Sequence, residues 1–105
     1  MIATQEELRT LIQGLIDAQL DGTRLAKRVM VLQELADTAQ SVARIAYDKA
    51  LEAAGDPEAI EWAVATGSAA SHANAEELEA TIAWREHLEN TDRLVQAARS
   101  LLGGL

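Results

Sequence analysis

Residues 51–58 read LEAAGDPE and contain the clearest interruption in the chain. Glycine tolerates the left-handed backbone conformation that commonly ends a helix, so Gly55 suits the position after a helix C-terminus. Asp56 can cap a following helix, and Pro57 fits its first position, where no backbone N–H is needed. Glu58 then places a negative charge near the positive end of the helix dipole. The sequence therefore predicts that one helix ends and another begins here.

Two helices are predicted before this turn. The residues TQEE at positions 4–7 form a capping box, and apolar residues follow at helical spacing, which predicts a first helix at about residues 5–19. Asp-Gly at 21–22 is typical of a turn, and Thr23 can cap a second helix over about residues 24–54. Apolar residues recur every three or four positions in it: Leu25, Val29, Leu32, Leu35, Ala36, Ala39, Val42, Ala43, Ala46 and Ala50.

Two further helices are predicted after the turn, at about residues 57–71 and 75–102. Asn74 and Glu77 have the spacing of a capping pair that would open the fourth helix, and Gly103-Gly104 would end it. These elements predict an all-α fold, a four-helix bundle of two long and two short helices joined by short turns. At 105 residues without cysteine, the chain is expected to form one domain with one core and no disulfide.

The segment at residues 62–78, WAVATGSAASHANAEEL, is rich in small side chains. They recur every three or four positions, so a helix through this segment would let another helix approach closely. Because Gly67, Ser71 and Asn74 weaken helix continuity, a hinge is the second interpretation. A single bent helix from residue 57 to residue 102 is the alternative to two separate helices.

Composition and charge disfavour several classes of function. The formal net charge of −8 opposes binding to the nucleic-acid backbone, which requires clustered Lys and Arg. No apolar stretch approaches the roughly 18 residues that suggest a membrane span, and the N-terminal residues lack the pattern of a signal peptide. We therefore expect a protein of the cytoplasm or of a virion, without membrane contact.

Two histidines are the candidates for chemistry. His87 falls on an apolar helix face beside Trp84 and Leu88, where a structural imidazole with a hydrogen-bond partner is favoured over a general base. His72 and Glu76 have the spacing to share a divalent metal on a helix, but two ligands do not complete a site. The sequence contains no Glu-x-x-His pair, phosphate-binding loop or nucleophile elbow. No catalytic, cofactor-binding or metal-ligating residue is therefore assigned.

Acidic residues dominate the middle of the chain. Between residues 50 and 84 there are seven acidic residues and no Lys or Arg. Such a surface could bind a basic partner or imitate nucleic-acid phosphates, although carboxylates near helix N-termini also complement the helix dipole. The surface candidates are Glu58, Glu61, Glu76, Glu77 and Glu79.

Apolar residues of the long helices exceed what the two short helices could cover, which predicts self-association. An exposed tryptophan is a frequent anchor at protein interfaces. The interface candidates are Val29, Leu32, Leu35, Val42, Trp62, Trp84, Leu88, Val95 and Leu102. We therefore expect a non-enzymatic helical protein–protein interaction or assembly module, from a bacterium or phage, that forms a homo-oligomer. The alternatives are an acidic inhibitor that binds a basic partner and a helical enzyme that uses His87.

Overall fold

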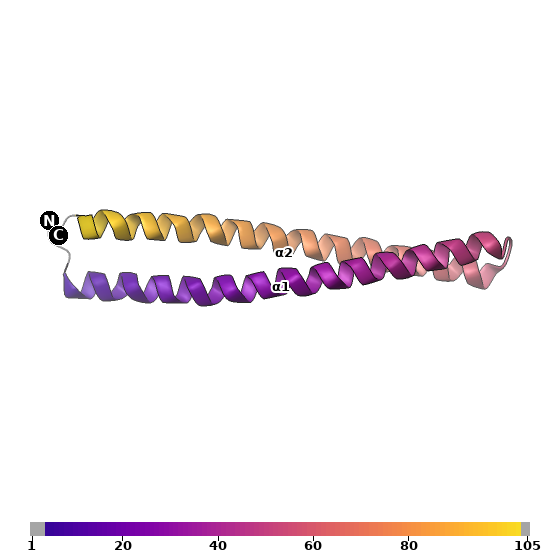
Figure 1. The fold of residues 1–105 in the computed structure, drawn as a ribbon, viewed down its shortest axis with the longest axis horizontal. Coiled ribbons are helices and arrows are strands. Elements are labelled where there is room, and N and C mark those ends of the chain that lie inside the picture. The colour runs from indigo at the N-terminus through magenta and orange to yellow at the C-terminus, as the bar shows by residue number, and fades with distance from the viewer. Residues whose placement is uncertain (1–3, 104–105) are drawn as a thin grey trace. The chain divides into compact units, whose positions relative to one another are not determined.

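The computed structural model describes residues 4–103, which form two α-helices joined by a turn at residues 53–56 (Figure 1). Helix α1 spans Gln5–Glu52 and helix α2 spans Pro57–Gly103. The residues described contain no strand, and the prediction of an all-α protein is confirmed. The predicted stop was Gly103-Gly104; α2 includes Gly103, and Gly104 lies outside the described residues.

The prediction of a four-helix bundle is wrong, because neither of the expected interruptions breaks its helix. At the first, the Thr23 hydroxyl donates to the Gln19 carbonyl (3.0 Å) instead of capping a new helix. At the second, the Asn74 side chain accepts a hydrogen bond from the Gln40 side chain of α1 (2.9 Å). A helical glycine costs only about 1 kcal/mol relative to alanine, which packing along a long helix offsets. The alternative of one helix from residue 57 to residue 102 is confirmed, because α2 continues without a break through residues 62–78.

Both helices begin with the caps that the sequence predicts. The Glu7 backbone N–H donates to Thr4 Oγ1 (3.1 Å), and the Glu58 N–H donates to Asp56 Oδ1 (3.1 Å). A proline occupies the first position of α2. Between the helices, Gly55 has a φ of 88°, a conformation that glycine adopts without strain. The chemistry of the turn was therefore predicted correctly.

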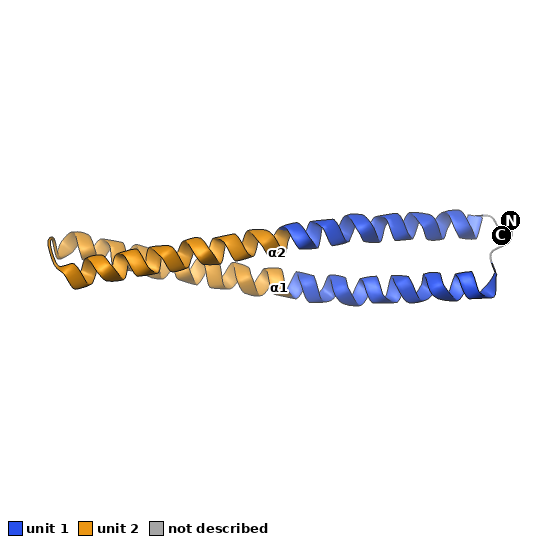
Figure 2. Cartoon of the chain, turned by 180° about the vertical axis from the view of Figure 1, so that it is seen from behind, with its two compact units in different colours: residues 1–27, 82–105 blue, residues 28–81 orange. Residues whose placement is uncertain are grey.

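The chain divides into two units, and each contains an antiparallel pair of helix segments (Figure 2). Unit 1 pairs α1 up to residue 27 with α2 from residue 82 onward. Unit 2 comprises residues 28–81, so it contains the turn.

Within each unit the helices meet along seams of buried or half-buried residues. On α1 these alternate three and four apart, the spacing of a coiled coil, and on α2 they lie three or four apart. The unit 1 seam contains Leu8, Leu11, Leu15, Ala18, Gly22 and Leu25 of α1, and Trp84, His87, Thr91, Val95, Ala98 and Leu101 of α2. The unit 2 seam contains Val29, Leu32, Ala36, Ala39, Ala43, Ala46 and Ala50 of α1, and Ala59, Ala63, Thr66, Ala70, Ala73, Glu77 and Ala80 of α2.

Candidate interaction surface

Small side chains form most of the seam in unit 2. From Ala36 to Ala50, five successive α1 seam positions are alanine, and most of the α2 positions across the seam are alanine as well. Short side chains let two helix axes approach to the lower end of the usual 8–10 Å range. The interpretation of residues 62–78 as part of a close helix seam therefore agrees with the burial of this segment.

The buried core of the described residues is also mostly alanine. Its members are Ala18, Val29, Leu32, Ala36, Ala46, Ala70, Ala80 and Ala98, so six of the eight are alanine. No large side chain of the described residues is fully buried. Most of the larger apolar side chains of the described residues are therefore half-buried in the seams or exposed outside them.

A second apolar row of α1 lies beside the alanine seam of unit 2. Val31, Leu35, Thr38, Val42 and Ile45 follow one another four, three, four and three residues apart, which repeats the spacing of the seam on the neighbouring side of the helix. We call these five residues the outer stripe. Its apolar side chains are 55%, 54%, 39% and 52% exposed in chain order. The outer stripe has the pattern of a helix-packing seam but no partner helix in unit 2.

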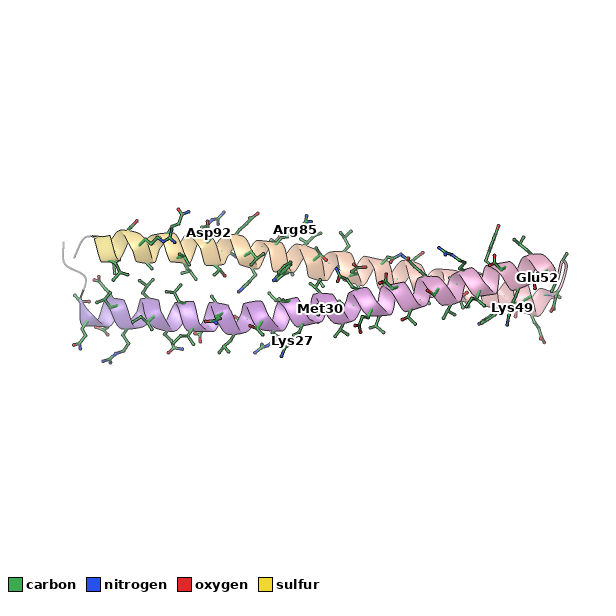
Figure 3. The ribbon with its side chains drawn as sticks, viewed as in Figure 1. Lys27, Met30, Lys49, Glu52, Arg85 and Asp92 are labelled. Carbon is green, nitrogen blue, oxygen red and sulfur yellow. The ribbon has the colours of Figure 1, made fainter. Side chains whose placement is uncertain are left out.

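Trp62 extends this apolar surface from α2. Lys49, which follows Ile45 at the same spacing along α1, places its ammonium nitrogen 5.6 Å from the centre of the Trp62 ring. This contact brings Trp62 beside the C-terminal end of the outer stripe, and Trp62 is 42% exposed. Figure 3 shows Lys49 and Glu52 at the end of unit 2 that contains the turn.

The predicted interface residues do not form a single surface. Val29 and Leu32 are buried in the seam of unit 2, whereas Leu35 and Val42 belong to the outer stripe. In unit 1, Trp84 and Val95 are half-buried in the seam, and Leu88 and Leu102 are exposed. The candidates therefore divide between contacts inside the chain and surface that is open to a partner.

Unit 1 also exposes apolar side chains, but in a different pattern. On α1, Ile12, Ile16 and Leu20 are exposed at four-residue spacing, and the charged Arg24 follows them. On α2, the exposed large apolar residues Ile82, Leu88, Leu94 and Leu102 lie six to eight residues apart. No run in unit 1 matches the outer stripe in length among the residues described.

Four of the five acidic candidates lie on the solvent-exposed side of α2. They form two pairs, Glu58 with Glu61 and Glu76 with Glu79, and all four are exposed. The pairs are separated by about 22 Å of helix, at 1.5 Å per residue. The fifth candidate, Glu77, is half-buried at the seam. The four exposed candidates are thus grouped in two places and do not form a continuous row.

His87 takes part in the pairing of the helices in unit 1. Its Nε2 donates a hydrogen bond to the Ala18 carbonyl of α1 (2.8 Å), and the Thr91 hydroxyl donates to the His87 carbonyl (2.9 Å). The ring packs against Gly22, where an added Cβ would lie 3.1 Å from Nε2. The Ala18 carbonyl of the facing helix therefore holds the imidazole by a hydrogen bond, which favours the structural interpretation of His87.

His72 and Glu76 do interact, as their spacing allows. His72 Nε2 lies 2.9 Å from a carboxylate oxygen of Glu76, and both side chains are open to solvent. Among residues 4–103 there is no group of three or more His, Cys, Asp or Glu side chains placed to hold a metal ion. The pair is therefore a surface contact within one helix.

Neither helix, over the residues described, has a segment long and apolar enough to cross a membrane.

Comparison with other proteins assigns neither a family nor a function to this chain. No protein family, no curated protein and no solved structure matches this chain.

Proposed function

We propose that this protein is a non-enzymatic assembly module that binds protein through exposed apolar helix faces, and that its first partner is a second copy of itself. The observation that supports this proposal is the distribution of side-chain size. Alanine fills most of the buried positions, while eighteen large apolar side chains of the described residues are exposed.

The energy of these exposed groups favours association. Complete burial of a Val, Leu or Ile side chain contributes about 1.5–3 kcal/mol relative to full exposure. The apolar members of the outer stripe are about half exposed, so each retains a substantial part of that contribution for an intermolecular contact. Large contiguous apolar patches on a protein surface commonly mark binding sites.

The polar groups that suggested other functions give those functions less support than the apolar surface gives to assembly. The imidazole of His87 is engaged with the Ala18 carbonyl, which gives it a role in helix pairing. The exposed acidic candidates of α2 form two separate pairs, which is a poor match to the regular phosphate spacing of nucleic acid. Packing of apolar helix faces is the function that uses the largest number of otherwise unexplained side chains.

Sedimentation equilibrium over the micromolar concentration range tests the proposal. We expect the mass to rise with concentration from 11.3 kDa to a defined multiple of it. The association should persist at high salt, because apolar contacts are not screened as surface charge pairs are. A single-chain mass at every concentration would contradict the proposal.

A further inference from the structure

We propose that the outer stripe of unit 2 is the surface on which two copies pair, with the two α1 segments antiparallel and related by a two-fold axis. This inference rests on the proposed function and specifies its contact surface. It is carried by the spacing of the outer stripe, by the charges at its two ends and by the position of Trp62.

The spacing defines the layers of the contact. The row contains two kinds of position: those whose next member is three residues later and those whose next member is four residues later. In an antiparallel pair of helices, each position of the first kind lies opposite a position of the second kind. Leu35 of one copy then opposes Ile45 of the second copy, and Thr38 opposes Val42 of the second copy. The two-fold axis repeats each pair, so two Leu–Ile layers flank the centre of the contact.

The charges at the ends of the outer stripe select this orientation. Continued at the same spacing, the row reaches Arg28 on its N-terminal side, and Lys49 and Glu52 on its C-terminal side. The antiparallel register places Arg28 opposite Glu52 of the second copy, twice in the dimer. A parallel, in-register pair would place Arg28 opposite Arg28 and Lys49 opposite Lys49, and like charges at such positions are unfavourable. Of these two arrangements, only the antiparallel one places Arg28 opposite a residue of opposite charge.

Lys49 and Trp62 complete the edge of this surface. In the antiparallel register Lys49 lies opposite Val31 of the second copy, where its aliphatic stem can cover the valine while the charged end stays over the Trp62 ring. The tryptophan is partly exposed beside the outer stripe. It can therefore be buried further by the second copy, as is common for interface tryptophans.

Cysteine cross-linking tests the register directly, because the natural chain contains no cysteine. Leu35→Cys and Ile45→Cys are prepared as separate variants, mixed and oxidised. The mixture should give a disulfide-linked dimer. Each variant alone should remain uncross-linked. In this register, residue 35 of one copy and residue 35 of the second copy are ten residues apart, or about 15 Å along the axis, and the same holds for residue 45. This distance is beyond the reach of a disulfide. Efficient cross-linking of Leu35→Cys alone would show parallel pairing and overturn the inference.

Two exposed leucines of unit 2 provide a matched pair of substitutions. Leu35 on the outer stripe is 54% exposed, and Leu78 on the other side of the helix pair is 61% exposed. Leu35→Glu should weaken dimer formation by about a hundred-fold or more, because it removes both Leu–Ile layers. Leu78→Glu should change it by no more than about two-fold, as is usual for a surface substitution outside a contact. Circular dichroism of both variants controls for loss of helix.

A charge exchange provides a second test that does not depend on apolar packing. Arg28→Glu alone and Glu52→Arg alone should each weaken the dimer, and the double variant should recover the wild-type affinity, since opposite charges again meet. No recovery in the double variant, or equal weakening by Leu35→Glu and Leu78→Glu, would overturn the inference even if the wild type is a dimer. A monomeric wild type would instead contradict the proposed function.

Discussion

In unit 2 the α1 positions that face α2 are alanine from residue 36 onward, whereas most α1 seam positions in unit 1 are leucine. The α1 positions one residue before each seam position show the reverse pattern, with mostly large apolar residues in unit 2 and mostly polar residues in unit 1. The outer stripe of unit 2 is mostly Val, Leu and Ile, but the same spacing continued back into unit 1 gives Thr10, Gly14, Asp17, Asp21 and Arg24. The helix therefore carries large apolar residues in both units, and what changes is the side on which they lie.

This comparison separates two ways of pairing helices. In unit 1, both helices contribute large side chains to the seam, and His87 fits over Gly22. In unit 2, small side chains meet small ones, so the helices hold together with little apolar area per residue. The second arrangement leaves the larger side chains available to another molecule, and the following changes test each seam.

The largest effect is expected from enlarging the alanine seam of unit 2. Ala46 has 0% of its surface exposed, so Ala46→Leu must push the helices apart and should lower the free energy of unfolding by about 3 kcal/mol. Ala75→Leu, at an exposed position of the same unit, is the control and should change stability by less than about 0.5 kcal/mol. Urea denaturation at one fixed protein concentration measures both. Equal stabilities would show that the seam of unit 2 is not closely packed.

A smaller effect is expected where a large side chain packs on a small one in unit 1. An added Cβ at Gly14 meets nothing within 4 Å, so Gly14→Ala should stabilise the protein by about 1 kcal/mol through helix propensity. At Gly22 the same Cβ would lie 3.1 Å from Nε2 of His87, whose hydrogen bond to Ala18 limits its movement. Gly22→Ala should therefore give no such gain, and should lower stability by up to about 1 kcal/mol, the typical net value of one hydrogen bond.

The glycine prediction has an internal check. In a background that carries His87→Ala, the crowding at residue 22 is relieved, and Gly22→Ala should become stabilising, as Gly14→Ala is. Identical effects of Gly22→Ala with and without the imidazole would show that His87 does not pack against this position.

The smallest effect is expected at the turn end of unit 2. Lys49→Met keeps a flexible, unbranched side chain of similar length but removes the charge over the Trp62 ring, which should cost about 0.5 kcal/mol. Lys49 also lies in the last turn of α1, where a positive charge favours the helix dipole. A double-mutant cycle with Trp62→Leu isolates the contact between the two side chains. A coupling energy indistinguishable from zero would contradict the interaction.

The turn and the helix caps could be predicted from sequence because they depend on local chemistry. Gly55, Asp56 and Thr4 act on the backbone within a few residues, and each does what its type and position predict. The breaks expected near Gly22 and Asn74 were wrong because contacts across the helix pair decide them. The Asn74 side chain, expected to cap a helix, instead bonds to Gln40, which is 34 residues away in sequence.

The outer stripe was not separated from the seam by sequence reasoning. Leu35 and Val42 each precede a seam alanine by one residue, so a search for apolar residues every three or four positions merges the two rows into one. A strict alternation of three and four separates them. The expected reason for self-association also changes: α1 and α2 are 48 and 47 residues long, so no short helix leaves a long one uncovered. The exposed surface arises because one helix carries two rows and unit 2 supplies a partner for only one.

The alanine seam has a further consequence for how the pairing of the two helices in unit 2 is fixed. A row of identical small residues looks nearly the same to its partner after a slide of seven residues, or about 10.5 Å along the axis. Apolar packing alone would therefore tolerate several alignments of the two helices. The short connection at residues 53–56 and the amide bridge between Gln40 and Asn74 distinguish among them. Lengthening that connection would give the helix pair a sliding freedom that no substitution on its outer surface would provide.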